Sequence, residues 1–128
     1  MTSSLFYLAL YGLVIIVVIL AQILTAAQQV GLSVLAGNRD NLVLTGLAGR
    51  LERATNNSLF ALALVSPAAL MINLSDPANV LIDQLMLTFL AARIAYVALY
   101  ALGIAWLRTA AWVTAFLCTA LSYVELVL

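Results

Sequence analysis

The stretch GRLERATNNSLF, residues 49–60, gathers arginines and asparagines in a chain that is 66% hydrophobic. Within it Arg50, Arg53 and Asn57 stand three and four residues apart, and this spacing places them on one face of a helix. Guanidinium groups bind carboxylates through paired N–H donors. The stretch therefore predicts a site for an anionic ligand.

A second stretch repeats this pattern further along the chain. Arg93, Tyr96 and Tyr100 share one helix face, and Arg93 stands deep inside an apolar run. An arginine in hydrocarbon is costly, so it normally faces the interior of a helix bundle and finds a partner there. A tyrosine hydroxyl can donate a hydrogen bond to a developing thiolate or oxyanion. Both stripes are predicted to face inwards, in the cytoplasmic half of the membrane.

The composition indicates the solvent in which these residues must work. Charged residues make up 8% of the 128 residues, whereas a soluble domain carries about 25%. The chain is therefore predicted to be an integral membrane protein. Five arginines balance five acidic residues without any basic run, which argues against nucleic acid as a partner. With no histidine and with Cys118 as the single cysteine, a thiolate–imidazole metal site is excluded.

Four apolar stretches are each long enough to span a bilayer, which takes about 20 residues. A turn signature at Ser75-Asp76-Pro77 and a very short turn at Ala105–Trp106 force neighbouring spans to pack antiparallel. The predicted fold is all-α, an integral membrane four-helix bundle in one domain. The long connection is residues 28–48, and the predicted spans are approximately 5–27, 49–74, 80–104 and 107–127.

The positions of the arginines predict the orientation in the membrane. Arg39, Arg50 and Arg53 stand in or just after the first connection, and Arg108 stands at the last turn. Both termini and the turn at residues 75–79 contain none. Because excess arginine marks the cytoplasmic side, both termini are predicted to lie on the other side, in a bacterial inner membrane.

Structural interpretations of the same residues compete with the site. Arg50, Arg53 and Arg108 can be interfacial anchors whose guanidinium groups reach lipid head groups. Glu52 can form an ion pair with Arg53, or with an arginine of another helix such as Arg93. The remaining tyrosines of the chain are predicted to form an aromatic belt at the membrane interface: Tyr7, Tyr11 and Tyr123.

The runs LTGLAGRLERATNN and AARIAYVALYALGIAWLRTAAW resemble the MAPEG family, the membrane-associated proteins of eicosanoid and glutathione metabolism, and above all its bacterial members. The resemblance covers nearly the whole chain and includes GNRDN in the first connection. It implies a homotrimer in membrane lipid, with glutathione bound as a cosubstrate between subunits. It also implies that Arg108 activates the thiol while five residues hold the tripeptide: Arg53, Asn57, Arg93, Tyr96 and Tyr100.

The sequence departs from the family pattern at several ligand positions. Phe60 stands where glutathione-using members typically carry a glutamate, which would meet the ammonium group of the ligand. Asn56 and Thr55 replace a basic residue and a histidine that several members carry, and Gln28-Gln29 stands where another basic ligand is common. Half of the polar set of the family is therefore present.

Two functions follow from these observations. One is a glutathione transferase or peroxidase that acts on lipophilic electrophiles or lipid hydroperoxides, with Arg108 stabilising the thiolate. The alternative is a non-enzymatic MAPEG-fold protein that binds lipid or another anionic amphiphile, and the apolar Phe60 favours it. A small multidrug-type transporter shares the four spans, but such proteins depend on an acid embedded in the first span, and residues 5–27 contain none.

Overall fold

Four long helices and one short helix make up the computed structural model, which describes residues 1–128. The long helices are α1 (Ser3–Val30), α3 (Gly46–Ser75), α4 (Val80–Leu102) and α5 (Ala105–Val127), and each is long and apolar enough to cross a membrane. The short helix α2 (Leu32–Ala36) lies within the first connection. The prediction of an all-helical bundle with four membrane spans is thus confirmed.

The helix ends follow from local chemistry. The side chain of Asn79 caps the start of α4 by accepting a hydrogen bond of 2.9 Å from the backbone N–H of Ile82. Gly103 ends α4 with φ +76°, a left-handed conformation that glycine adopts at little cost. The turn between α4 and α5 therefore lies at Gly103 and Ile104, two residues before the predicted Ala105–Trp106.

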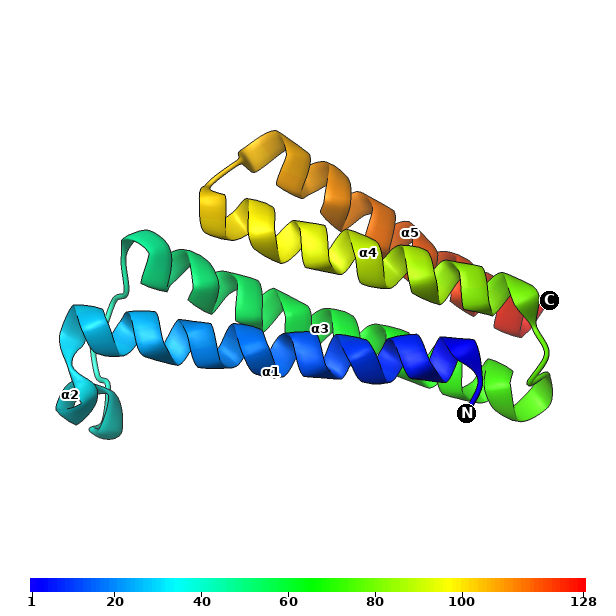
Figure 1. Cartoon of the computed structure of the whole chain (residues 1–128), viewed down its shortest axis with the longest axis horizontal. Helices are drawn as coiled ribbons and strands as arrows, with labels where there is room; N and C mark the ends of the chain where they lie inside the picture. The colour runs from blue at the N-terminus through cyan, green and yellow to red at the C-terminus, as the bar shows by residue number, and fades with distance from the viewer.

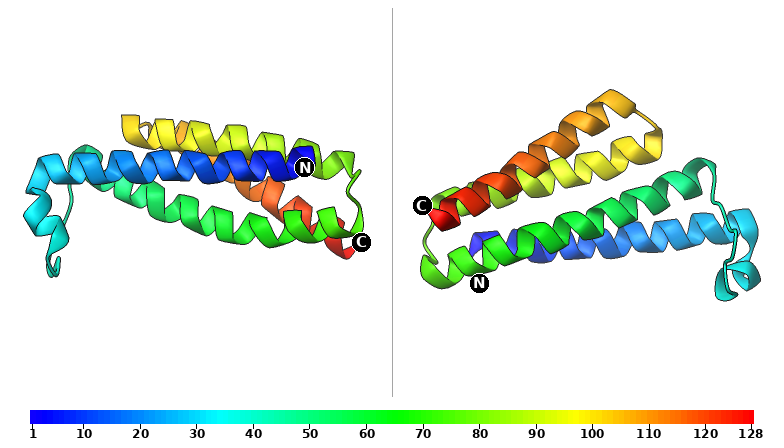
Figure 2. Two further views of the ribbon diagram at one scale, coloured as in Figure 1. Left: turned by 60° about the horizontal axis from the view of Figure 1, so that its bottom comes forward. Right: turned by 180° about the vertical axis from the view of Figure 1, so that it is seen from behind.

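The long helices form two antiparallel pairs that spread apart at one end (Figure 1). α1 runs beside α3, and α4 runs beside α5. The pairs lie close together near both chain termini and diverge towards the α4–α5 turn, as the views in Figure 2 also show. The bundle consequently has a narrow end, which holds the termini, and a wide end, which holds the first connection.

The main hydrophobic core fills the narrow half of the bundle. All four long helices contribute to it, and Phe89 of α4 meets Tyr11 of α1 edge to face, with ring centroids 5.0 Å apart. Because these apolar residues close the narrow half, space for a ligand remains towards the wide end. The core consists of Tyr11, Ile15, Val65, Ala69, Ile72, Ile82, Leu85, Met86, Phe89, Leu90, Ala92, Ala115 and Cys118.

The first connection is fixed to the wide end by a glutamine clamp. The side-chain amide of Gln29 donates to the carbonyl and hydroxyl oxygens of Thr45, and its oxygen accepts from the Thr45 N–H at 3.0 Å. Gly49 lets the connection pass close by, since a Cβ there would lie 2.5 Å from the carbonyl oxygen of Leu44. A small second core lies under this connection: Ala26, Leu35, Leu44 and Ala48.

Candidate functional site

A cleft between α3, α4 and α5 opens at the wide end of the bundle, with a volume of about 310 Å³. It collects polar residues from helices that are remote in sequence, so only the folded chain brings them together. Each of the three helices contributes side chains to this space: α3 an amide, α4 two phenol rings, and α5 a guanidinium group and an indole ring. The lining residues are Asn57, Tyr96, Tyr100, Arg108, Thr109 and Trp112.

Tyr100 lies between two guanidinium groups at this cleft. The Nε–H of Arg53 donates to the Tyr100 hydroxyl at 3.1 Å. The guanidinium carbon of Arg108 lies 4.3 Å from the centroid of the same ring, and that of Arg53 lies 5.8 Å from it. Two cations that share one aromatic ring repel each other, and an anion between them relieves that repulsion. The arrangement therefore suits a negatively charged ligand group.

Arg93 is the most buried cation of the chain, with 1% of its surface exposed. Its Nε–H donates to the Tyr11 hydroxyl at 2.9 Å, Nη1 donates to the Asn57 side chain at 3.0 Å, and Nη2 to the Ser58 hydroxyl at 3.1 Å. Its guanidinium carbon also lies 4.3 Å from the centroid of the Tyr96 ring. A guanidinium has five N–H donors, so three go to the protein and one on each terminal nitrogen remains.

This network corrects two predictions. Arg93 does not pair with Glu52, which is exposed on α3, because neutral oxygens of α1 and α3 surround its guanidinium group instead. Tyr11 does not belong to an interfacial belt, because it is fully buried and donates to the carbonyl oxygen of Ser58 at 3.0 Å. A buried guanidinium needs polar partners wherever it lies, and a mid-span tyrosine supplies one.

The predicted stripe on α3 divides into two parts in the structure. Arg53 and Asn57 both contact α4 residues of the site. Arg50 instead donates through Nε to the carbonyl oxygen of Ala101 at 3.1 Å, near the end of α4. A helix leaves its last carbonyl groups unpaired and carries partial negative charge there, so Arg50 caps α4 and holds it against α3.

The ion pair predicted between Glu52 and Arg53 does not form. The Arg53 guanidinium turns towards Tyr100 on α4, while Glu52 is exposed. Arg50, Arg53 and Arg93 thus donate their hydrogen bonds to neutral oxygens alone. Because none of these hydrogen bonds involves a carboxylate, they leave the positive charges of the three arginines unneutralised.

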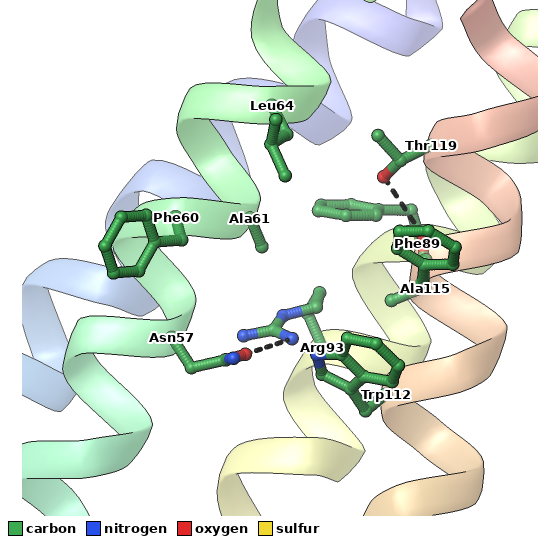
Figure 3. A pocket seen from close by; sticks show the side chains of 10 residues that line it. Asn57, Phe60, Ala61, Leu64, Phe89, Arg93, Trp112, Ala115 and Thr119 are labelled. Carbon is green, nitrogen blue, oxygen red and sulfur yellow. Dashed lines mark hydrogen bonds between the residues drawn. The ribbon is translucent and has the colours of Figure 1, made fainter.

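An apolar cavity of about 230 Å³ adjoins the cleft on the side of the core. Asn57 and Trp112 line both spaces, so the cleft and the cavity meet at these two side chains. Figure 3 shows Arg93 reaching from α4 to Asn57 on α3, with Phe89 and Trp112 beside it. The cavity is lined by Asn57, Phe60, Ala61, Leu64, Phe89, Arg93, Trp112, Ala115, Phe116 and Thr119.

Aromatic rings dominate the wall of this cavity. The ring of Trp112 stacks on that of Phe116, with centroids 5.3 Å apart and an angle of 10° between the planes. Phe60 lies at the rim, where 71% of its surface is exposed. A lipophilic group binds favourably in such a cavity, because moving apolar surface out of water lowers the free energy.

All six residues predicted for the site meet around the cleft and its adjoining cavity. Three further residues escaped prediction. Tyr11 and Ser58 hold Arg93, and Trp112 lines both the cleft and the cavity. Ser58 directly follows Asn57 in sequence, but nothing in the local pattern relates Tyr11 or Trp112 to an arginine on another helix.

A comparison of the sequence with known protein families finds that residues 5–128 match the MAPEG family. The chain belongs to the MAPEG family. The match covers nearly the whole of this MAPEG chain. Comparisons with curated proteins and with solved structures gave no match. Family membership and the four apolar helices make this MAPEG chain an integral membrane protein.

Proposed function

We propose that this MAPEG protein is a membrane enzyme that uses glutathione to conjugate a lipophilic electrophile or to reduce a lipid hydroperoxide. One observation carries the proposal. Arg53 and Arg108 flank the ring of Tyr100 at a cleft that shares Asn57 and Trp112 with an adjoining aromatic cavity. An anionic cosubstrate and a lipophilic partner can therefore bind side by side.

The donor set fits most of glutathione. Its two carboxylates suit the free N–H groups of Arg53 and Arg108, because one guanidinium group can bind one carboxylate through two parallel hydrogen bonds. Its ammonium group has no carboxylate among the residues that line the cleft. Phe60 adds no polar atom to the rim. We therefore expect weaker binding than in a family member with a glutamate at that position.

Each side chain has a role that its geometry supports. Arg108 lowers the cost of a negative sulfur, because a guanidinium group beside a thiol favours the ionised form. The Tyr100 hydroxyl accepts from Arg53, so its own proton is free to point towards the sulfur. Glutathione, when bound, supplies the nucleophilic sulfur. Cys118 lies in the core and away from the residues of the cleft.

The proposal includes the homotrimer that the family implies and the membrane orientation that the positions of the arginines predict. Large apolar surfaces remain exposed along the long helices, and lipid or further copies of the chain can cover them. Native mass spectrometry of the detergent-solubilised protein tests the trimer, and a monomeric mass would contradict it. Labelling of a cysteine placed at Thr2 in sealed inverted and right-side-out vesicles tests the orientation.

The enzyme is tested by glutathione conjugation with the wild type, Arg108→Ala and Arg108→Lys. Loss of one donor to a developing anion lowers turnover by about 10²- to 10³-fold, and we expect a loss of this size in Arg108→Ala. Arg108→Lys keeps the charge and should recover part of the rate. Thr114→Ala is the matched control on α5, because Thr114 is exposed and bonds only to the Ala110 carbonyl of its own helix.

Thermal unfolding and native mass spectrometry show whether each variant keeps its fold. A folded Arg108→Ala protein with normal conjugation would refute the mechanism. Absence of any glutathione-induced stabilisation of the wild type at millimolar concentration would refute the use of glutathione.

A second candidate is a non-enzymatic protein that binds an anionic amphiphile in the same place. The exposed Phe60 at the rim favours it, because an acyl chain contacts a phenyl ring better than a hydrophilic tripeptide does. Under this candidate, native mass spectrometry detects a co-purified anionic amphiphile that Arg108→Ala loses, while glutathione has no effect. Conjugation by the wild type would contradict it.

A further inference from the structure

A separate groove lies between α1 and α2, in the part of the bundle that Figure 1 places on the opposite side of α1 from α4 and α5. Its volume is about 280 Å³, and it shares no residue with the cleft or its adjoining cavity. Apolar side chains form most of its wall, and Arg39 is its one charged lining residue. The lining residues are Gln22, Ile23, Ala26, Leu32, Leu35, Ala36 and Arg39.

The length of α1 places this groove at the edge of the hydrocarbon layer. That layer is about 30 Å thick, which a helix with a rise of about 1.5 Å per residue crosses in about 20 residues. Counted from Leu5, the first apolar residue of α1, the crossing ends near Leu24. Ile23 and Ala26 therefore lie on either side of the boundary between the acyl chains and the head groups.

Arg39 is held in place over this groove. Its Nε–H donates to the carbonyl oxygen of Leu35 at the end of α2, which leaves both terminal nitrogens free. Its backbone has φ +59°, a left-handed conformation that is uncommon for a residue with a side chain. Such backbone conformations gather at ligand clamps, where the surrounding structure imposes them. The nearest acidic residue in sequence, Asp40, is exposed.

The short helix α2 presents apolar side chains outwards beside this arginine. Leu32 has 70% of its surface exposed and Val34 has 44%. At the interface of a membrane these side chains reach the upper part of the acyl chains, while the guanidinium of Arg39 stays among the phosphates. The groove therefore combines an apolar wall with one cationic group, the two features that an anionic lipid molecule needs.

We propose that this groove binds one anionic phospholipid, with its phosphate at Arg39 and the first part of an acyl chain along Ile23, Leu32 and Leu35. Basic pockets beside membrane spans recognise anionic head groups in this way. The predicted cytoplasmic position of the first connection places the groove in the leaflet rich in such lipids. A zwitterionic lipid carries its own ammonium group, which competes with the guanidinium for the phosphate, so it binds less tightly.

The test is native mass spectrometry of the full-length protein in detergent, titrated with phosphatidylglycerol or with phosphatidylcholine of the same acyl chains. We expect one tightly bound phosphatidylglycerol per chain, and a loss of affinity of about 5- to 10-fold in Arg39→Ala, since one arginine near an anionic surface contributes about that much. Arg39→Lys keeps the charge and should retain most of the binding.

Arg50→Ala is the matched control, because it removes another guanidinium group from the same end of the bundle, and Arg50 lines neither this groove nor the cleft and its adjoining cavity. It should bind phosphatidylglycerol as the wild type does. Equal affinity for the two lipids, or an unchanged affinity in Arg39→Ala, would overturn the proposal. Displacement of the lipid by inorganic phosphate at millimolar concentration would show a site for a free anion, and would overturn it as well. Glutathione conjugation does not enter this test.

Discussion

Tyr11→Phe is the sharpest test of the network that holds Arg93. The substitution removes one oxygen atom from a side chain that is fully buried, so it leaves almost no cavity. It breaks two hydrogen bonds, one accepted from the Arg93 Nε–H at 2.9 Å and one donated to the Ser58 carbonyl at 3.0 Å. The N–H of a buried guanidinium group is then left without a partner.

The two bonds set the size of the effect. A hydrogen bond to a charged group contributes about 1.5–3 kcal/mol to stability, and a neutral one about 1 kcal/mol. Measured hydrogen bonds between membrane helices are weaker, on average about 0.6 and at most about 1.7 kcal/mol. Because Arg93 is 1% exposed and water cannot replace the lost partner, we expect Tyr11→Phe to lower the free energy of unfolding by about 2 kcal/mol.

The assay is reversible unfolding in mixed micelles of increasing sodium dodecyl sulfate content, followed by tryptophan fluorescence. Tyr7→Phe is the matched control, because Tyr7 lies one helical turn away on α1, is half-buried and has no hydrogen-bond role in the Arg93 network. It should change stability by less than about 0.5 kcal/mol.

A double-mutant cycle with Arg93→Met isolates the pair. We expect a coupling energy of about 1–1.5 kcal/mol between Tyr11 and Arg93, near the upper limit for membrane helices. A coupling near zero, or equal losses in Tyr11→Phe and Tyr7→Phe, would refute the inference that the hydroxyl holds the guanidinium group.

Two further predictions concern the first connection and its contact with α3. Gln29→Ala removes the clamp and should raise the rate of amide hydrogen exchange several-fold in the connection, while Gln28→Ala, which removes an exposed side chain outside the clamp, should leave it unchanged. Exchange that is equal in both variants would refute the clamp. Gly49→Ala places a Cβ 2.5 Å from a backbone oxygen and should cost about 1–3 kcal/mol of unfolding free energy. Gly12→Ala, with open space around its Cβ, should raise the free energy of unfolding by up to about 1 kcal/mol. A Gly49→Ala protein as stable as Gly12→Ala would contradict the close approach of Leu44 to Gly49.

Much of the site could be predicted because helical spacing is a local property. Arg53 and Asn57 share a face wherever α3 lies, and so do Arg93, Tyr96 and Tyr100 on α4. Hydrocarbon leaves few places for an arginine, so Arg93 had to face other helices. The same reasoning could not name its partners, because Tyr11 is 82 residues away in sequence and the pairing depends on how α1 packs on α4.

The sequence by itself determined the solvent, the four spans and the inward-facing polar stripes, since the bilayer fixes span length and the price of each buried charge. Only the tertiary structure decided which polar groups meet. The cleft lies where the α4–α5 pair diverges from α1 and α3. Packing in the narrow half buries Tyr11 in the core, where its hydroxyl bonds to Arg93 instead of lying at the membrane interface. Packing also turned Arg53 from Glu52 towards Tyr100. Such choices depend on contacts between helices, which no periodicity along one helix contains.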